Sequence, residues 1–237
     1  MPIFLHELGE LDIRGTSDIC SLVTVESLRT FRFKRYDPDC WLCIEAIPCA
    51  DKIESLDLEG VELISAEHFD FGHEFLKLLK MRLCRISNRI QSSLITPNLQ
   101  DLTLIDIEPD WDYQNRSRPA CKNLEKENVG SMLNGEDMLE GFTLKRLTLG
   151  SMLLDQSLPS KLRIQPALET LSIIDCNLTM HFLTWLANRD ARSKDILPSL
   201  SRIHLTGCAC LDKEYSLDKF VRDCAVSFPS VQVVIDP

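Results

Sequence analysis

Residues 168–179 read Leu-Glu-Thr-Leu-Ser-Ile-Ile-Asp-Cys-Asn-Leu-Thr, and residues 200–211 read Leu-Ser-Arg-Ile-His-Leu-Thr-Gly-Cys-Ala-Cys-Leu. Both stretches place an aliphatic residue at the first, fourth and sixth positions, and the fourth and sixth positions enclose one polar or variable residue. That period of two is typical of a strand with one buried face. Such a strand cannot bury its apolar face alone, so the pattern predicts that neighbouring units stack on one another.

The same motif occurs nine times in the 237 residues, and its successive starts are 20, 25, 25, 21, 45, 24, 32 and 28 residues apart. Most of these intervals lie in or near the range of roughly 20 to 29 residues that is typical of leucine-rich repeats. By first, fourth and sixth residue the motifs are Leu8, Leu11, Ile13; Leu28, Phe31, Phe33; Ile53, Leu56, Leu58; Leu78, Met81, Leu83; Leu99, Leu102, Leu104; Leu144, Leu147, Leu149; Leu168, Leu171, Ile173; Leu200, Ile203, Leu205; and Phe228, Val231, Val233.

The segments between the motifs are expected to return the chain, and residues 178–188 and 211–226 have the apolar spacing of helices. The sequence therefore predicts an α/β fold: a leucine-rich-repeat solenoid with a curved parallel sheet on the concave side and helices on the convex side. About nine irregular repeats form a single domain over residues 1–237. Strands are expected near residues 10–14, 30–34, 55–59, 80–84, 101–105, 146–150, 170–174 and 202–206.

The interval of 45 residues leaves a polar, acidic insertion at about residues 108–143. Three interpretations remain open: a tolerated loop, a degenerate extra repeat, or a binding loop. The last is favoured by Trp111 and Tyr113, two aromatic residues outside any apolar periodicity and close to arginines.

The ninth motif position is cysteine in the two quoted stretches, at Cys176 and Cys208. In this respect the chain resembles the cysteine-containing repeats of F-box/leucine-rich-repeat proteins. In that family an F-box binds a Skp-type adaptor of a cullin ubiquitin ligase, and the repeats hold the substrate. The first motif begins at Leu8, which leaves no room for an F-box, so adaptor binding is expected only through a segment missing here.

The net charge and the composition of the first residues argue against several classes of partner and against secretion. The formal net charge of −10 argues against nucleic acid and against anionic membrane. No apolar run reaches the length of a membrane span, and the first 15 residues contain Glu7, Glu10 and Asp12 where a signal peptide would be basic and then apolar. We expect a cytoplasmic or nuclear protein whose ten cysteines are reduced.

The third, fifth and seventh motif positions are expected to point out of the concave face. In the fifth row Asp12, Arg32, Asp57 and Arg82 alternate in sign, which predicts cross-strand ion pairs. The seventh row becomes apolar at Ile105, Gly150 and Ile174, and such a patch on an exposed face often marks a partner site. The third row adds a charged rim of Lys80, Asp101, Arg146 and Arg202. The residues expected to bind a protein partner are Arg82, Ile105, Trp111, Tyr113, Arg146, Thr148, Ser172, Ile174, Arg202 and His204.

No motif predicts catalysis, a cofactor or a metal site. Cys40 and Cys43 form the single C-x-x-C pair, without a second pair at zinc-site spacing, and the apolar residues around Trp41 favour buried thiols on a return helix. Nucleophile-elbow and phosphate-loop motifs do not occur. The chain is therefore expected not to be an enzyme.

The leading hypothesis is a protein-interaction module, in its narrower form the substrate-recognition part of an F-box-type ubiquitin ligase. One alternative is a leucine-rich-repeat regulator of a small GTPase, for which Arg82 and Arg85 are the candidate residues. Another is the sensing end of a larger receptor. The first repeat has no polar cap before it, so we expect the N-terminal end to associate with another chain or to continue in a further segment.

Overall fold

The structure is a computed structural model, and the chain divides into two compact units, Met1–Cys121 and Lys122–Pro237. The division falls inside the predicted insertion, and the single repeat domain remains a prediction. The residues that the structure describes are 3–5, 7–15, 23–25, 27–35, 41–43, 52–64, 75–82, 84–87, 98–111, 143–154, 158, 162, 165–187, 197–213 and 215–237.

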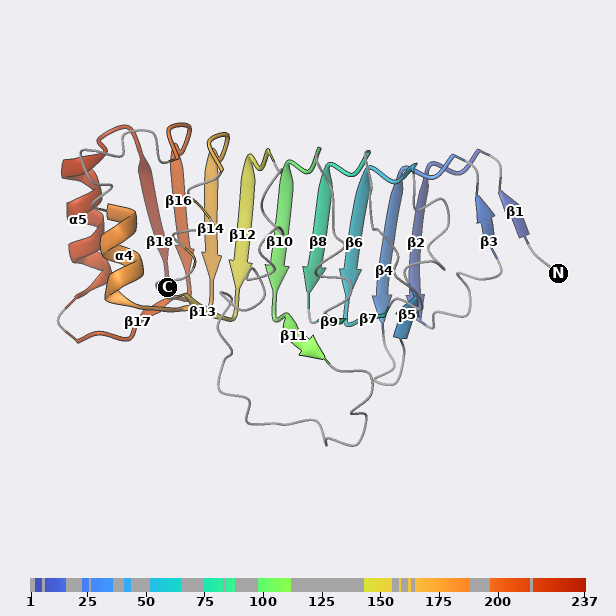
Figure 1. The fold of residues 1–237 in the computed structure, drawn as a ribbon, viewed down its shortest axis with the longest axis horizontal. Helices are drawn as coiled ribbons and strands as arrows, with labels where there is room; N and C mark the ends of the chain where they lie inside the picture. Colours follow the sequence, from blue (N-terminus) through green and yellow to red (C-terminus); the bar gives the residue numbers. More distant parts are fainter. Residues whose placement is uncertain are drawn as a thin grey trace. The chain divides into compact units, whose positions relative to one another are not determined.

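The first unit is built on five parallel strands that follow one another in chain order (Figure 1). They are β2 (Glu10–Gly15), β4 (Thr30–Arg35), β6 (Ser55–Glu59), β8 (Leu78–Arg82) and β10 (Asp101–Ile105). Burial alternates along β6, β8 and β10, so one face of each strand is buried and the other is partly exposed. The parallel strands predicted near residues 10–14, 30–34, 55–59 and 101–105 are thus confirmed, whereas the one predicted near residues 80–84 lies at Leu78–Arg82.

The buried face consists of aliphatic and aromatic side chains that lie opposite one another on neighbouring strands. Phe31 lies opposite Leu56, and Leu56 lies opposite Leu79. Each of these side chains is at most 3% exposed. Full burial of such a side chain contributes about 1.5–3 kcal/mol, so this stacking contributes substantially to the stability of the unit.

A second parallel ladder in the first unit was not predicted from the sequence. It comprises β5 (Trp41–Cys43), β7 (Glu62–Ile64), β9 (Arg85–Ser87) and β11 (Glu108–Trp111). The predicted return helix around Trp41 is therefore wrong at Trp41–Cys43, because three residues there pair as a strand with β7. Residues 108–111 likewise belong to a paired strand rather than to a polar insertion.

A further pair of short strands, β1 (Ile3–Leu5) and β3 (Val23–Val25), is also parallel. Both strands lie before a longer strand of the first unit, β1 before β2 and β3 before β4.

The second unit repeats this arrangement with four parallel strands. They are β12 (Arg146–Gly150), β14 (Thr170–Ile174), β16 (Arg202–Thr206) and β18 (Gln232–Asp236). A short parallel ladder follows the first three of them: β13 (Leu153–Leu154), β15 (Asn177–Leu178) and β17 (Ala209–Cys210).

Two helices of the second unit lie where the sequence predicted them. The helix α4 (Met180–Ala187) falls within residues 178–188, and α5 (Leu217–Ser227) overlaps residues 211–226. The helix α5 begins later because Ser216 caps it: its hydroxyl accepts a hydrogen bond from the Lys219 N–H. No described helix is both long and apolar enough to cross a membrane.

The strand register corrects two of the nine sequence motifs by two residues. Leu79 and Met81 pair with Leu56 and Leu58, so the fourth motif begins at Leu76 rather than at Leu78. In the last motif Val233 and Ile235 pair with Ile203 and Leu205, so that motif also moves by two. A shift of two residues keeps every side chain on its face and changes only its neighbours.

Five of the long strands, β6, β10, β12, β14 and β16, are followed directly by a residue in the left-handed region. The φ angle is 52° at Asp106, 58° at Ser151 and 51° at Asp175, and glycines occupy this place at Gly60 and Gly207. A Cβ at Gly207 would lie 2.1 Å from Asp175 Oδ1, so a larger residue here would have to displace the Asp175 carboxylate as well as adopt the left-handed conformation.

The corrected register predicts that substitutions at two adjacent leucines lower the free energy of unfolding by very different amounts. Leu79→Ala removes a buried side chain, and we expect a loss of about 2–5 kcal/mol in the free energy of unfolding measured by urea denaturation. Leu78→Ala changes a half-exposed position and is expected to cost less than about 1 kcal/mol. An equal loss at both positions, or a larger loss at Leu78, contradicts the register.

Candidate functional site

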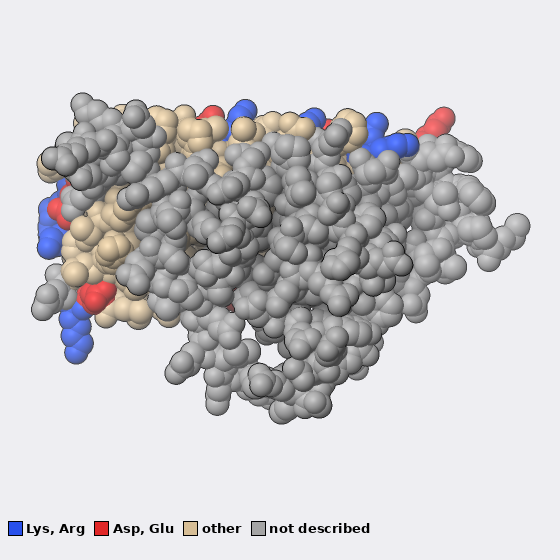
Figure 2. Space-filling view, in the orientation of Figure 1, with Lys and Arg blue, Asp and Glu red and all other residues tan. Residues whose placement is uncertain are grey.

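The exposed face of the first unit is densely charged and has no net formal charge. Its third, fifth and seventh motif positions contain five basic and five acidic side chains on strands β2 to β10. They are Arg14, Arg32, Lys34, Lys80 and Arg82, and Glu10, Asp12, Asp57, Glu59 and Asp101. In the view of Figure 2, basic and acidic side chains are interspersed along the upper edge of the coloured surface.

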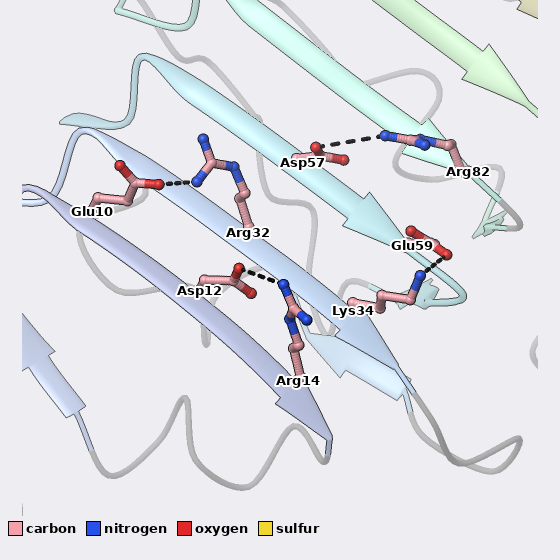
Figure 3. Close-up of polar contacts among 8 residues, drawn as sticks. All are labelled: Glu10, Asp12, Arg14, Arg32, Lys34, Asp57, Glu59 and Arg82. Carbon is pink, nitrogen blue, oxygen red and sulfur yellow. Dashed lines mark hydrogen bonds and ion pairs between the residues drawn. The ribbon is translucent and has the colours of Figure 1, made fainter.

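Four ion pairs connect these side chains (Figure 3). Arg32 on β4 donates to Glu10 on β2, and Lys34 on β4 donates to Glu59 on β6. The other two pairs are Arg14–Asp12 at 3.4 Å, within β2, and Arg82–Asp57 at 3.9 Å, between β8 and β6.

The predicted salt ladder along the fifth row is not the pattern that forms. Arg32–Glu10 and Arg82–Asp57 are diagonal pairs, Lys34–Glu59 is a direct pair in the seventh row, and Arg14–Asp12 lies within one strand. The fifth-row pairs do not form because a long arginine side chain reaches a third-position or seventh-position neighbour as easily as a fifth-position one. The register also replaces Arg82 by Lys80 in the fifth row and Cys84 by Arg82 in the seventh.

A direct cross-strand row of charged side chains lies one residue before the strands and was not predicted from the sequence. Glu54 Oε2 lies 2.8 Å from Lys77 Nζ, and Glu54 Oε1 lies 3.7 Å from Arg29 Nε. The hydrogen bond and the charge of Lys77 lower the pKa of Glu54 below its usual value, and Arg29 adds to this effect. In the sequence, this row could have been predicted from the alternation in charge of Arg29, Glu54 and Lys77 at the second motif position.

Most of these ion pairs are solvent-exposed, and exposed pairs typically contribute about 0–1 kcal/mol each; Lys34–Glu59 and Arg82–Asp57 are partly buried. Their main effect is to fix a charge pattern on a rigid sheet. Arg82 is a partial exception, since its Nε is shielded from solvent and has no hydrogen-bond partner among the described residues. Arg82 also lies directly opposite Ile105, which is half-buried at the end of β10.

The exposed face of the second unit is mostly uncharged. Thr148, Ser172 and His204 lie opposite one another on β12, β14 and β16. Arg146 and Arg202 are exposed and lie on either side of Thr170 in the third row. The structure thus brings together six of the predicted site residues on one face: Arg146, Thr148, Ser172, Ile174, Arg202 and His204.

His204 has an acidic partner on the next strand. His204 Nε2 lies 2.6 Å from Asp236 Oδ2 on β18 and 3.5 Å from Thr206 Oγ1. The two-residue correction of the last motif moves Asp236 to the seventh position and next to Thr206. The pair joins the last two strands on their exposed face.

The predicted apolar patch is only partly present in the second unit. Ile174 is half-buried on the exposed face, but its neighbour Gly150 is buried. Ile105 belongs to the first unit. Trp111 is the last residue of β11, in the second ladder of that unit, and Tyr113 lies outside the described residues.

Three thiols follow strands at equivalent places, one more than the sequence motif indicated. Each thiol contacts a carbonyl oxygen on the long strand before the one that it follows. The contacts are Cys84 with Leu58, Cys176 with Leu149 and Cys208 with Ile173, over 3.3–3.7 Å. Burial raises the pKa of Cys84 to about 11 and also raises the pKa of Cys208. Cys84 is therefore protonated at neutral pH and unsuited to act as a nucleophile.

No group of three or more histidine, cysteine or carboxylate side chains in the described part of the chain could hold a metal ion.

Comparison with known proteins identifies no relative: the sequence matches no protein-family model, and no curated protein is significantly similar to it.

The second-position row predicts a measurable pKa change. Lys77→Met should raise the pKa of the Glu54 carboxyl toward 4.5, because the main cause of its lowering is removed. The carboxyl of Glu54 can be followed by NMR titration. Its lowered pKa contributes stability that is lost as the pH falls through the folded-state pKa, so the variant should lose less stability on acidification than the parent chain.

Lys52→Met is the matched control, since Lys52 is exposed and does not contribute to the lowered pKa of Glu54. An unchanged Glu54 titration in Lys77→Met would show that the second-position row does not form in solution.

Proposed function

We propose that this chain is a protein-interaction module of the leucine-rich-repeat type, which binds a protein partner on the exposed faces of its parallel strands. The observation that carries the proposal is the alternation along the long strands, where every second side chain is buried and those between remain available. Sheets of this kind hold their exposed side chains in fixed positions, which favours recognition of a protein surface.

The repeat assignment is supported by features of the chain that recur with the motif. Parallel strands, a left-handed residue after the strand, and a buried or half-buried cysteine after it occur in both units. A curved solenoid of about nine repeats, with the exposed face on the concave side, is the arrangement that we propose for them. No catalytic role is part of the proposal.

The two faces suit different kinds of contact. The first unit offers paired charges of both signs, which favour a partner with a complementary mixed pattern and give binding that weakens with salt. The second offers hydroxyl groups, Ile174 and two arginines, which favour hydrogen bonding around an apolar contact. The narrower role, holding a ubiquitylation substrate for an F-box-type ligase, would require such a partner to be ubiquitylated in a manner that depends on this chain.

The test is capture of binding partners with the full chain and two variants. Ile105→Asp combined with Ile174→Asp should leave the fold intact, since both side chains are half-exposed, and should reduce recovery of the main partner by roughly tenfold or more. Quantitative mass spectrometry measures recovery, and circular dichroism verifies folding.

Phe75→Asp is the control, because Phe75 is 54% exposed and lies before β8 rather than on its exposed face. Equal recovery of the same proteins by the parent chain and the folded double variant would contradict the proposed binding face.

A further inference from the structure

The last strand of the second unit has an uncovered apolar side. Val233 and Ile235 on β18 lie opposite Ile203 and Leu205, which are fully buried on β16. Val233 itself is only half-buried, and Ile235 is 36% exposed. The apolar layer that the other strands bury is therefore open at β18, and β16 is the one strand paired with β18 in the described residues.

The backbone of β18 is also open on that side. The Gln232 N–H donates to the Ser201 carbonyl over 2.8 Å, and the Asp236 carbonyl accepts from the Gly207 N–H over 3.1 Å. In a parallel ladder the residues that bond to one neighbour alternate, so residues 232, 234 and 236 face β16. The N–H and C=O groups of Val233 and Ile235 point to the opposite edge. An exposed apolar edge of this kind is a template for another strand.

We propose that this edge pairs with the same edge of a second copy of the chain, antiparallel and centred on Val234. In this register Val233 lies opposite Ile235 of the second copy, and each pair exchanges two hydrogen bonds through the groups that point outward. Val234 lies opposite its own counterpart, at the two-fold axis. The proposal concerns the edge of the sheet and does not depend on the partner-binding face.

The residues of β18 are self-complementary in this register, which is why a second copy fits better than an unrelated strand. On the core side valine meets isoleucine and extends the buried layer. On the exposed side the Gln232 amide meets the Asp236 carboxylate of the second copy, a donor opposite an acceptor. In the two-fold arrangement the β18 edge of each copy is occupied by the other copy, so the pairing gives a closed dimer rather than a fibre.

The ends of the strand limit the pairing to this register. Pro237 follows the strand and has no N–H to offer, and the Val231 N–H already donates to the Phe228 carbonyl over 3.0 Å. A register shifted toward either end would therefore lose hydrogen bonds. A second exposed apolar side chain, Val226 at 85%, lies near the end of α5, the helix directly before this strand.

The test compares two lysine substitutions two residues apart, by sedimentation velocity of the full chain over a range of concentrations. The parent chain should be in monomer–dimer equilibrium. Val234→Lys puts two like charges directly opposite each other and should weaken the dimer by roughly tenfold or more. Gln232→Lys puts a lysine opposite Asp236 of the second copy and should leave the dimer as strong or stronger.

A cross-linking experiment decides the question even where Val234→Lys fails to fold. Val234→Cys places two thiols in a non-hydrogen-bonded antiparallel pair, at a separation that a disulfide can span, so mild oxidation should give a covalent dimer linked through residue 234. Gln232→Cys is the control with the same background of native cysteines, and it should not link to its own counterpart.

A parent chain that stays monomeric at all concentrations would overturn the proposal, and so would a dimer that both lysine variants retain equally. Cross-linking at residue 232 but not at 234 would also overturn it.

Discussion

The stacking of buried side chains between neighbouring parallel strands is the interaction on which the rest of this structure depends. A single strand such as β6 carries two inward side chains, Leu56 and Leu58, and buries them only because β4 and β8 lie on either side. Each strand is thus a poor folding unit alone and a stable one between two others. At β18, which pairs with β16 alone in the described part of the chain, the same apolar positions are half-buried at Val233 and exposed at Ile235.

Only one face of each strand is needed to bury apolar side chains. Because burial is supplied by one face, the side chains of the other face are free to vary, and the two units use that freedom differently. Paired charges such as Lys34–Glu59 cover the first, whereas hydroxyl groups around His204 predominate on the second. Exposed ion pairs contribute little stability, so folding does not require this pattern, and under the proposed function the pattern would determine which partner is bound.

Much of the fold could be predicted from the sequence because a period of two is strong evidence when leucine carries it. The strands around Leu56, Leu102 and Leu171 were predicted at their observed places. The fourth motif was misread by two residues, since apolar residues at Leu76, Leu78 and Leu79 satisfy either register and neither choice changes the buried face.

The short second ladder could not be predicted, because three-residue strands such as Glu62–Ile64 have too few residues to show a period. Of the candidate site, the members of each exposed face were predictable from alternation. Their partners were not, because a side chain such as Arg32 reaches Glu10 diagonally, and only the geometry of the register decides that contact.

Cross-strand proton contacts in the first unit test the central claim most directly, measured as nuclear Overhauser effects on the isotope-labelled chain. The parallel, stacked arrangement predicts contacts between the side chains of Leu56 and Leu79 and between those of Leu58 and Met81. Contacts of Leu56 with Met81, or the close α-proton pairs of antiparallel strands, would contradict it.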